Sequence, residues 1–179
     1  MANTYKLIDS RSLTSSTGSV IFSAIPQTYT DLILNISAKD GRSDYADDLK
    51  ITINANTSAT YSNVRGFGSA PSSTSADGGS GAWSAGYSYN GFVTGSTNSA
   101  DRFGVASFLF TNYTDNTRLK GWTHDSGNGG LSSANQFQLG MGGGQTSDTN
   151  PITIIKLEGY NSGTLEAGST FYLYGISNT

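Results

Sequence analysis

The chain has 179 residues, of which only 13% are charged, 23 are glycine and none is cysteine; its formal net charge is −3. The lack of cysteine excludes disulfides and thiolate metal sites. The absence of a Lys/Arg cluster argues against a surface that follows a nucleic-acid backbone. The start, "MANTYKLIDS", has neither the basic residues nor the apolar run of a signal peptide, and no apolar run is long enough to predict a membrane span.

Apolar and polar residues alternate along most of the chain, which is typical of β-strands with one buried face. The pattern is clearest at 48–55, where Leu49, Ile51 and Ile53 alternate with polar residues. Turn signals such as "KDGRSD" and "TDNT" separate the segments. Ten segments are expected to form strands: 4–8, 18–25, 29–38, 48–55, 61–67, 102–113, 118–124, 135–141, 152–160 and 170–176. We therefore predict one all-β domain over 1–179, an antiparallel β-sandwich of jelly-roll type with about eight to ten strands and essentially no helix.

Two Gly/Ser-rich stretches interrupt the pattern, at 68–100 and 125–150, and both are predicted to be long loop insertions. The first carries aromatic residues that a simple linker would lack. Three roles are open for these rings: packing on their own domain, contact with a neighbouring protein, or stacking on a glycan. The candidates for partner or glycan contact, one of which lies outside the two stretches, are Trp83, Tyr87, Tyr89, Phe92 and Trp122.

The last strand, 170–176, is apolar on both faces. Phe171 and Leu173 share one face, while Tyr172, Tyr174 and Ile176 share the other. The second face is covered by the N-terminal segment that contains Tyr5, by loops of the second sheet, or by another subunit. Another subunit is the favoured interpretation, so Tyr172, Tyr174, Ile176 and Tyr5 are the candidates for self-association or capsid contact.

Few residues carry catalytic chemistry. His124 is the only histidine and is expected at the surface. Glu158 alternates with Lys156 on one predicted strand, which predicts an ion pair rather than a catalytic acid. The sequence therefore predicts no enzyme, no catalytic residue, no metal site and no cofactor.

The acidic segment 40–48 contains Asp40, Asp44, Asp47 and Asp48. Its spacing does not match a calcium loop, which needs ligands at alternate positions and a closing glutamate. We expect a solvated loop there, although whether it binds calcium stays open. "GMGGGQ", at 140–145, lacks the following helix of a phosphate loop.

Three stretches resemble a family of small structural proteins of tailed bacteriophages: "LTSSTGSVIFSAIPQTYTDLILNISAKDG" (13–41), "LKITINANTSATYSNVRGFGS" (49–69) and "ITIIKLEGYNSGTLEAGSTFYLYGISNT" (152–179). The resemblance implies a virion component with a β-sandwich fold, on a capsid or on a tail. It brings no catalytic residues with it.

Two functions follow as hypotheses. The first is a capsid decoration or cement protein on the outer surface of the phage particle. It is expected to be a homo-oligomer, a trimer, that binds the major capsid protein and neither nucleic acid nor membrane. The second is a tail-fibre or tailspike domain that binds host-surface glycans through the aromatic residues. A polysaccharide-cleaving enzyme that uses Glu158 and Glu166 is the weakest alternative.

Overall fold

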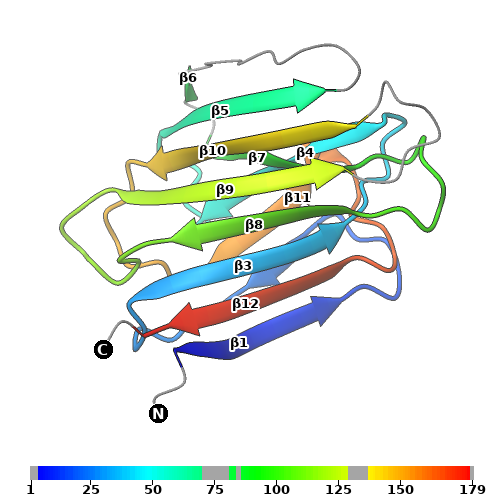
Figure 1. Ribbon diagram of the computed structural model, residues 1–179. Helices are drawn as coiled ribbons and strands as arrows, with labels where there is room; N and C mark the ends of the chain where they lie inside the picture. Colours follow the sequence, from blue (N-terminus) through cyan, green and yellow to red (C-terminus); the bar gives the residue numbers. More distant parts are fainter. Residues whose placement is uncertain (1–3, 70–80, 84–85, 129–136, 178–179) are drawn as a thin grey trace.

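The computed structural model describes residues 4–69, 81–83, 86–128 and 137–177. They form two antiparallel β-sheets that pack face to face, so the predicted all-β sandwich is confirmed (Figure 1). Beyond the strands, the described residues include one turn of 3-10 helix, η2 (Tyr160–Ser162). No helix within the described residues is long and apolar enough to cross a membrane.

The large sheet has eight strands and the small sheet has four. In spatial order the large sheet contains β1 (Tyr5–Ser12), β12 (Thr170–Ile176), β3 (Asp31–Ala38), β8 (Gly104–Phe110), β9 (Lys120–Asn128), β10 (Gln138–Thr146), β5 (Tyr61–Ser69) and β6 (Gly81–Trp83). The small sheet contains β2 (Val20–Phe22), β11 (Ile155–Gly159), β4 (Ala46–Ile53) and β7 (Ser88–Thr94).

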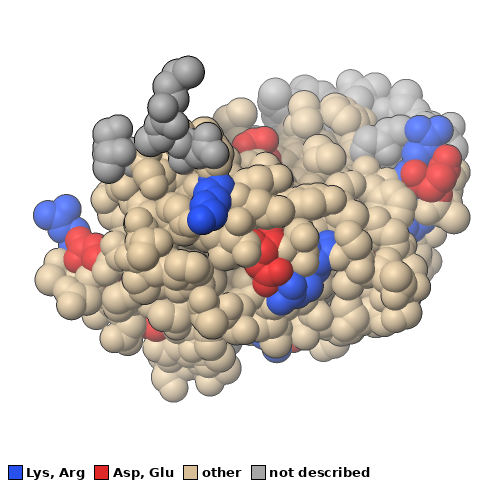
Figure 2. All heavy atoms as spheres, turned by 90° about the horizontal axis from the view of Figure 1, so that it is seen from below, with Lys and Arg blue, Asp and Glu red and all other residues tan. Residues whose placement is uncertain are grey.

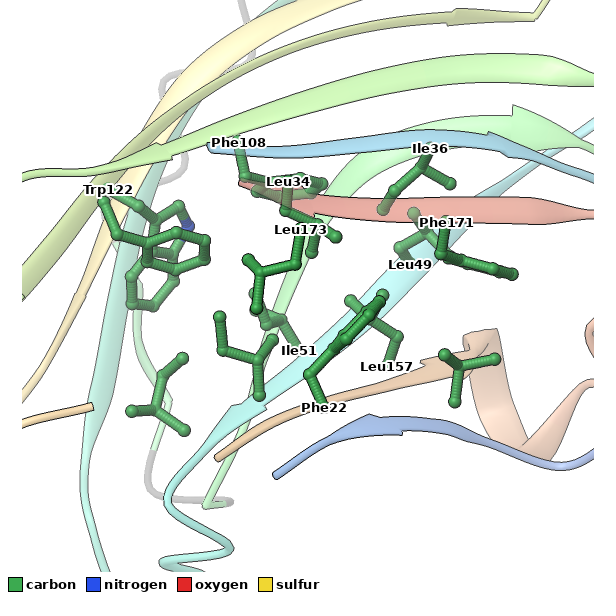
Figure 3. Close-up of a cluster of buried hydrophobic side chains, with 14 of the residues drawn as sticks. Phe22, Leu34, Ile36, Leu49, Ile51, Phe108, Trp122, Leu157, Phe171 and Leu173 are labelled. Atoms are coloured by element: carbon green, nitrogen blue, oxygen red, sulfur yellow. The ribbon is translucent and has the colours of Figure 1, made fainter. Parts of the chain in front are cut away.

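The core lies between the two sheets and is built from alternate residues of the strands, as the period-two pattern predicts. Leu34, Phe108 and Leu173 of the large sheet face Phe22 and Ile51 of the small sheet (Figure 3). All five side chains are completely buried. A fully buried side chain of this size contributes about 1.5–3 kcal/mol, so this layer holds the two sheets together.

Eight of the strands pair in a nested order, with the first half of the chain against the second. β1 pairs with β12, β2 with β11, β3 with β8 and β4 with β7. The remaining four strands, β5, β6, β9 and β10, extend the large sheet beyond β8. β7, at the edge of the small sheet, packs against β9 and β10 of this extension.

Two of these strands lie where the sequence predicted a loop. β6 and β7 fall inside 68–100. β6 has only three residues, and β7 has small or polar residues at buried positions such as Ser88, Asn90 and Gly91, so little apolar pattern can be detected. β10 continues through "GMGGGQ" to Thr146, five residues beyond the predicted end of that strand. The stretch 125–150 is therefore largely sheet in its described part.

Glycines on β10 are needed where aromatic rings lie against the inner face of the sheet. A β-carbon on Gly140 would come within 2.7 Å of Cε2 of Phe92, and one on Gly144 within 2.6 Å of Cε2 of Trp122. Real β-carbons essentially never approach other atoms below 3.0 Å. The glycine run is therefore part of a tightly packed strand and not of a flexible loop.

β1 pairs edge to edge with β12, so the N-terminal segment extends the large sheet and does not lie over its outer face. The start of β1 and the end of β12 lie at the same corner of the molecule (Figure 1). On the inner face at this corner, the ring of Tyr29 occupies the space that Gly175 leaves beside the core.

Candidate functional site

The outer face of the large sheet is the most unusual surface of the molecule. Seven of the eleven large hydrophobic side chains that are exposed in the described part of the chain lie on it. They are Tyr5, Leu7, Val64, Val105, Leu139, Met141 and Tyr172, and their exposed fractions run from 37% to 70%. Together they present on the order of 600 Å² of apolar surface, since a half-exposed ring or aliphatic chain contributes about 100 Å². Exposed apolar surface of this extent is typical of interaction sites. The polar residues Asn35, Ser107 and Asp125 lie between Tyr172 and Met141 on this face.

Charged residues are scarce on this face. The strand register places Asp31 and Asp125 there, and no Lys or Arg among the described strand positions whose side chains point outward. Seen from the β1 edge, the molecule carries only scattered charged side chains (Figure 2). An exposed sheet face with these large apolar side chains and so few charges is suited to burial against another protein surface.

The structure brings the predicted self-association residues together. Tyr172 and Tyr174 lie on the outer face of β12, and Leu7 and Tyr5 of β1 pair with Tyr174 and Ile176. Ile176 itself is buried, at 7% exposure, beside the β1 edge and outside the main core cluster. Tyr172 is 37% exposed and Tyr174 is partly buried, so both rings reach the surface.

A shallow depression of about 430 Å³ lies farther along the same sheet. It is lined by parts of β5, β9 and β10, including Ser62, Val64, Gly143 and Gln145. Gly143 has no side chain between Thr123 and Val64, its neighbours across the strands, and this gap forms the depression. Sequence reasoning missed this half of the outer face, because Val64, Leu139 and Met141 each stand alone among glycines and polar residues.

The other predicted aromatic residues are distributed over different parts of the molecule. Tyr87 and Tyr89 lie on the outer side of the small sheet, where Tyr89 also contacts Tyr160 at a ring-centroid distance of 4.7 Å. Trp83 lies on the edge strand β6, and its side chain is outside the described part of the structure. Phe92 is partly buried at the edge of the small sheet, near Gly140.

The tyrosine cluster, formed by Tyr87, Tyr89 and Tyr160, is capped by cations. Nζ of Lys50 lies 4.3 Å from the ring centroid of Tyr87, and the guanidinium of Arg42 lies 4.8 Å from that of Tyr160. Cations in these positions are attracted to the ring faces. They occupy surface that a sugar ring would need for stacking.

Trp122 and His124 are both in the interior, at 4% and 5% exposure. The expectation that His124 lies at the surface is therefore wrong. The side chains of His124 and Trp122, two residues apart, both point to the inner face of β9, and His124 stacks on Phe108. Burial, and next the positive charge of Arg65, lowers the pKa of His124 to about 4. A neutral ring inside the sandwich packs as an apolar group, and its charged form is disfavoured.

The acidic segment is also less solvated than expected. Asp40 is completely buried and Asp47 is 6% exposed. Arg42 ties them together: its backbone N–H donates to Oδ1 of Asp40 at 2.7 Å, and its guanidinium pairs with Oδ1 of Asp47 at 2.9 Å. Burial raises the pKa of Asp47 to about 7 and also raises the pKa of Asp40. Within the described ranges, no group of three or more acidic or histidine side chains is arranged to hold a metal ion.

The two glutamates have structural partners. Glu158 pairs with Lys156 at 2.8 Å and with Lys50 across the strands at 3.1 Å, which confirms the predicted ion pair. Glu166 accepts hydrogen bonds from the hydroxyls of Ser16 and Thr164. Each carboxylate is thus engaged in holding neighbouring strands or turns.

Comparisons of the chain with protein-family models, with curated proteins and with solved structures found no significant match. The outer face of the large sheet is the candidate functional surface on its own geometry.

Proposed function

We propose that this chain is a non-enzymatic structural protein of a bacteriophage virion, most specifically a capsid decoration or cement protein on the outer surface of the particle. It acts as a symmetric homo-oligomer that also binds the major capsid protein. The observation that carries the proposal is the broad, apolar and almost uncharged outer face of the large sheet. The resemblance of three stretches of the sequence to phage structural proteins supports the assignment to a virion.

The mechanism is mechanical. Burying apolar surface contributes roughly 25 cal/mol per Å², so 600 Å² is worth on the order of 15 kcal/mol before the entropy of association is subtracted. Tyrosine contributes strongly to interface energies because its ring is large and rigid. Repeated over many copies, such contacts hold neighbouring shell subunits against the pressure of packed DNA.

The jelly-roll form of the sandwich belongs to the same proposal. Its support is the nested pairing of β1 with β12, β2 with β11, β3 with β8 and β4 with β7, which wraps a two-stranded ribbon into two sheets. In this description β5, β6, β9 and β10 are additions that widen one sheet. They enlarge the surface on which the proposed function depends.

A tail-fibre or tailspike domain that binds host glycans is the second candidate, and the tyrosine cluster favours it. Three adjoining rings with Asn161 beside them, whose Oδ1 accepts a hydrogen bond from the hydroxyl of Tyr89 at 3.3 Å, are a surface that sugars recognise. The cations over two of these rings reduce the area open to stacking, so we place this function second.

Locating the protein on intact virions tests the proposal. Labelled antibody and quantitative mass spectrometry of purified particles are expected to give hundreds of copies per particle, distributed over the head. A dozen or so copies on the tail, together with glycan binding that a Tyr89→Ala substitution removes, would overturn the capsid assignment in favour of the second candidate.

A further inference from the structure

We propose that two copies of this chain pair face to face through the outer faces of their large sheets, about a twofold axis that runs across the strands. This inference rests on the proposed function, because it names a second copy as the partner of the same surface. It replaces the trimer expected from the sequence by a dimer, and it leaves binding of the capsid protein to other parts of the molecule. It follows from the register of the strands, which places large and small side chains in adjacent rows.

The outward-pointing residues form rows that cross the sheet. One row, from β12 to β5, contains Tyr174, Ile33, Leu109, Thr123, Gly143 and Val64. The next row contains Tyr172, Asn35, Ser107, Asp125, Met141 and Gly66. The two rows are about 7 Å apart, since alternate residues of a strand are separated by two rises of about 3.4 Å.

A twofold axis that passes between these rows places the first row of one copy opposite the second row of the other copy, and the reverse. Large residues then face small ones: Leu109 faces Ser107, and Val64 faces Gly66. A twofold contact uses one patch twice and therefore requires such self-complementarity. The match in size holds on β8, β10 and β5, whereas on β12 the rings of Tyr174 and Tyr172 face each other and on β3 Ile33 faces Asn35.

The same operation places Met141 opposite Gly143. Met141 is the most exposed of the large hydrophobic side chains in the described part of the chain, at 70%. Gly143 lies in the depression of about 430 Å³, which is large enough to receive a methionine side chain. Each copy thus offers one protruding side chain and one shallow depression, centred two residues apart on β10.

The charges of this face are compatible with the pairing. Asp125 faces the hydroxyl of Thr123, which donates a hydrogen bond to it, and not the Asp125 of the second copy. The next row on each side contains Asp31 and Ser37, respectively, so Asp31 of one copy faces the hydroxyl of Ser37 of the other. The 600 Å² of apolar surface on each copy, with its polar rim, approaches the roughly 800 Å² per partner of a stable interface.

Cross-linking between single-cysteine variants tests the axis, because the chain has no cysteine of its own. Packed sheets lie about 10 Å apart, beyond the reach of a disulfide, so a short bis-maleimide is used. The axis places Leu139 of one copy opposite Gln145 of the other, and these two positions lie about 20 Å apart within one chain. We expect a mixture of Leu139→Cys and Gln145→Cys proteins to give at least tenfold more cross-linked dimer than either variant alone.

Ile21→Cys is the matched control, because Ile21 is 45% exposed on the small sheet. Its mixture with Gln145→Cys is expected to give only background cross-linking. In sedimentation, Met141→Asp is expected to weaken self-association by about 100-fold, because both halves of a twofold contact carry the change, while Ile21→Asp leaves it unchanged. Equal cross-linking in all mixtures, a monomeric wild-type protein or a stable trimer would overturn the inference.

These results separate the inference from the proposed function. A monomeric wild-type protein that decorates phage heads in high copy number would overturn the twofold contact and leave the cement function standing. Specific Leu139–Gln145 cross-links in a protein found on no phage head would support the twofold contact and overturn the cement function.

Discussion

The indole ring of Trp122 lies directly against the α-carbon of Gly144 on the neighbouring strand. A β-carbon at position 144 would come within 2.6 Å of Cε2 of this ring. The ring is held from the other sides by Tyr61 and Phe110, at centroid distances of 6.3 and 5.9 Å. It therefore has little room to move away.

From this contact we predict that Gly144→Ala lowers the free energy of unfolding by about 1–3 kcal/mol, the usual cost of overpacking a core. Urea unfolding followed by tryptophan fluorescence measures the change. Gly121→Ala is the control, because its β-carbon would lie 3.6 Å from the carbonyl oxygen of Gly144, an ordinary contact. Equal stability of the two variants would show that the packing of Trp122 is looser than described.

Replacing Asp47 by asparagine is predicted to stabilise the protein above neutral pH. Burial raises the pKa of Asp47 to about 7, so the folded state holds a proton that the unfolded state has already lost. Stability from this group is present below about pH 4 and is lost as the pH rises to about 7. Between pH 6 and pH 8 we expect the free energy of unfolding of the wild type to fall by about 1 kcal/mol more than that of Asp47→Asn.

Asp101→Asn is the control for this experiment, because the Asp101 side chain is 78% exposed. Its pH dependence is expected to follow the wild type. Identical slopes for Asp47→Asn and the wild type would contradict a protonated carboxyl at this position.

His124 is predicted to titrate with a pKa of about 4. As it is the only histidine, its Cε1 proton gives one assignable NMR resonance that reports the titration directly. Because the pKa is lower in the folded state, stability from this group is present above about pH 6.5 and is lost as the pH falls to about 4. An NMR midpoint near 6.5 would contradict the burial of the ring.

Much of the fold is predictable from local pattern. The strands that supply the core, such as β3, β4 and β12, show clear alternation because one of their faces is buried and the other is not. β6 was missed because it is only three residues long, and β7 and β10 were missed or misplaced because many of their buried or inward positions are small or polar, such as Ser88, Asn90, Gly140 and Gly144. At Gly140 the apolar partner is the ring of Phe92, from a distant part of the sequence, so no local signal exists.

The candidate surface was predictable in part, for a similar reason. Tyr172 and Tyr174 stand out in the sequence because they alternate with core residues on one strand. Val64, Leu139 and Met141 come from β5 and β10, and only the pairing of β10 with β5 on one side and with β9 on the other brings them onto one face. The burial of Asp40 and His124 was likewise invisible, because segments distant in sequence cover them.

The apolar outer face of β12 leads to a prediction for a double substitution, Tyr172→Ser plus Tyr174→Ser. Both rings are on the outer face, so their loss leaves the core intact and the protein folded. The loss of two partly exposed tyrosine rings from an interface is expected to weaken self-association by about 100-fold or more. Circular dichroism checks the fold, and Ile21→Ser on the small sheet is the matched control.

Sedimentation equilibrium of the purified wild-type chain beside this double variant tests the central claim most directly. The account predicts a mass that is a multiple of 18.7 kDa for the wild type at tens of micromolar, and a return to the single-chain mass for the variant. A wild-type protein that stays at 18.7 kDa up to millimolar concentration, or a double variant that associates as strongly as the wild type, would contradict it.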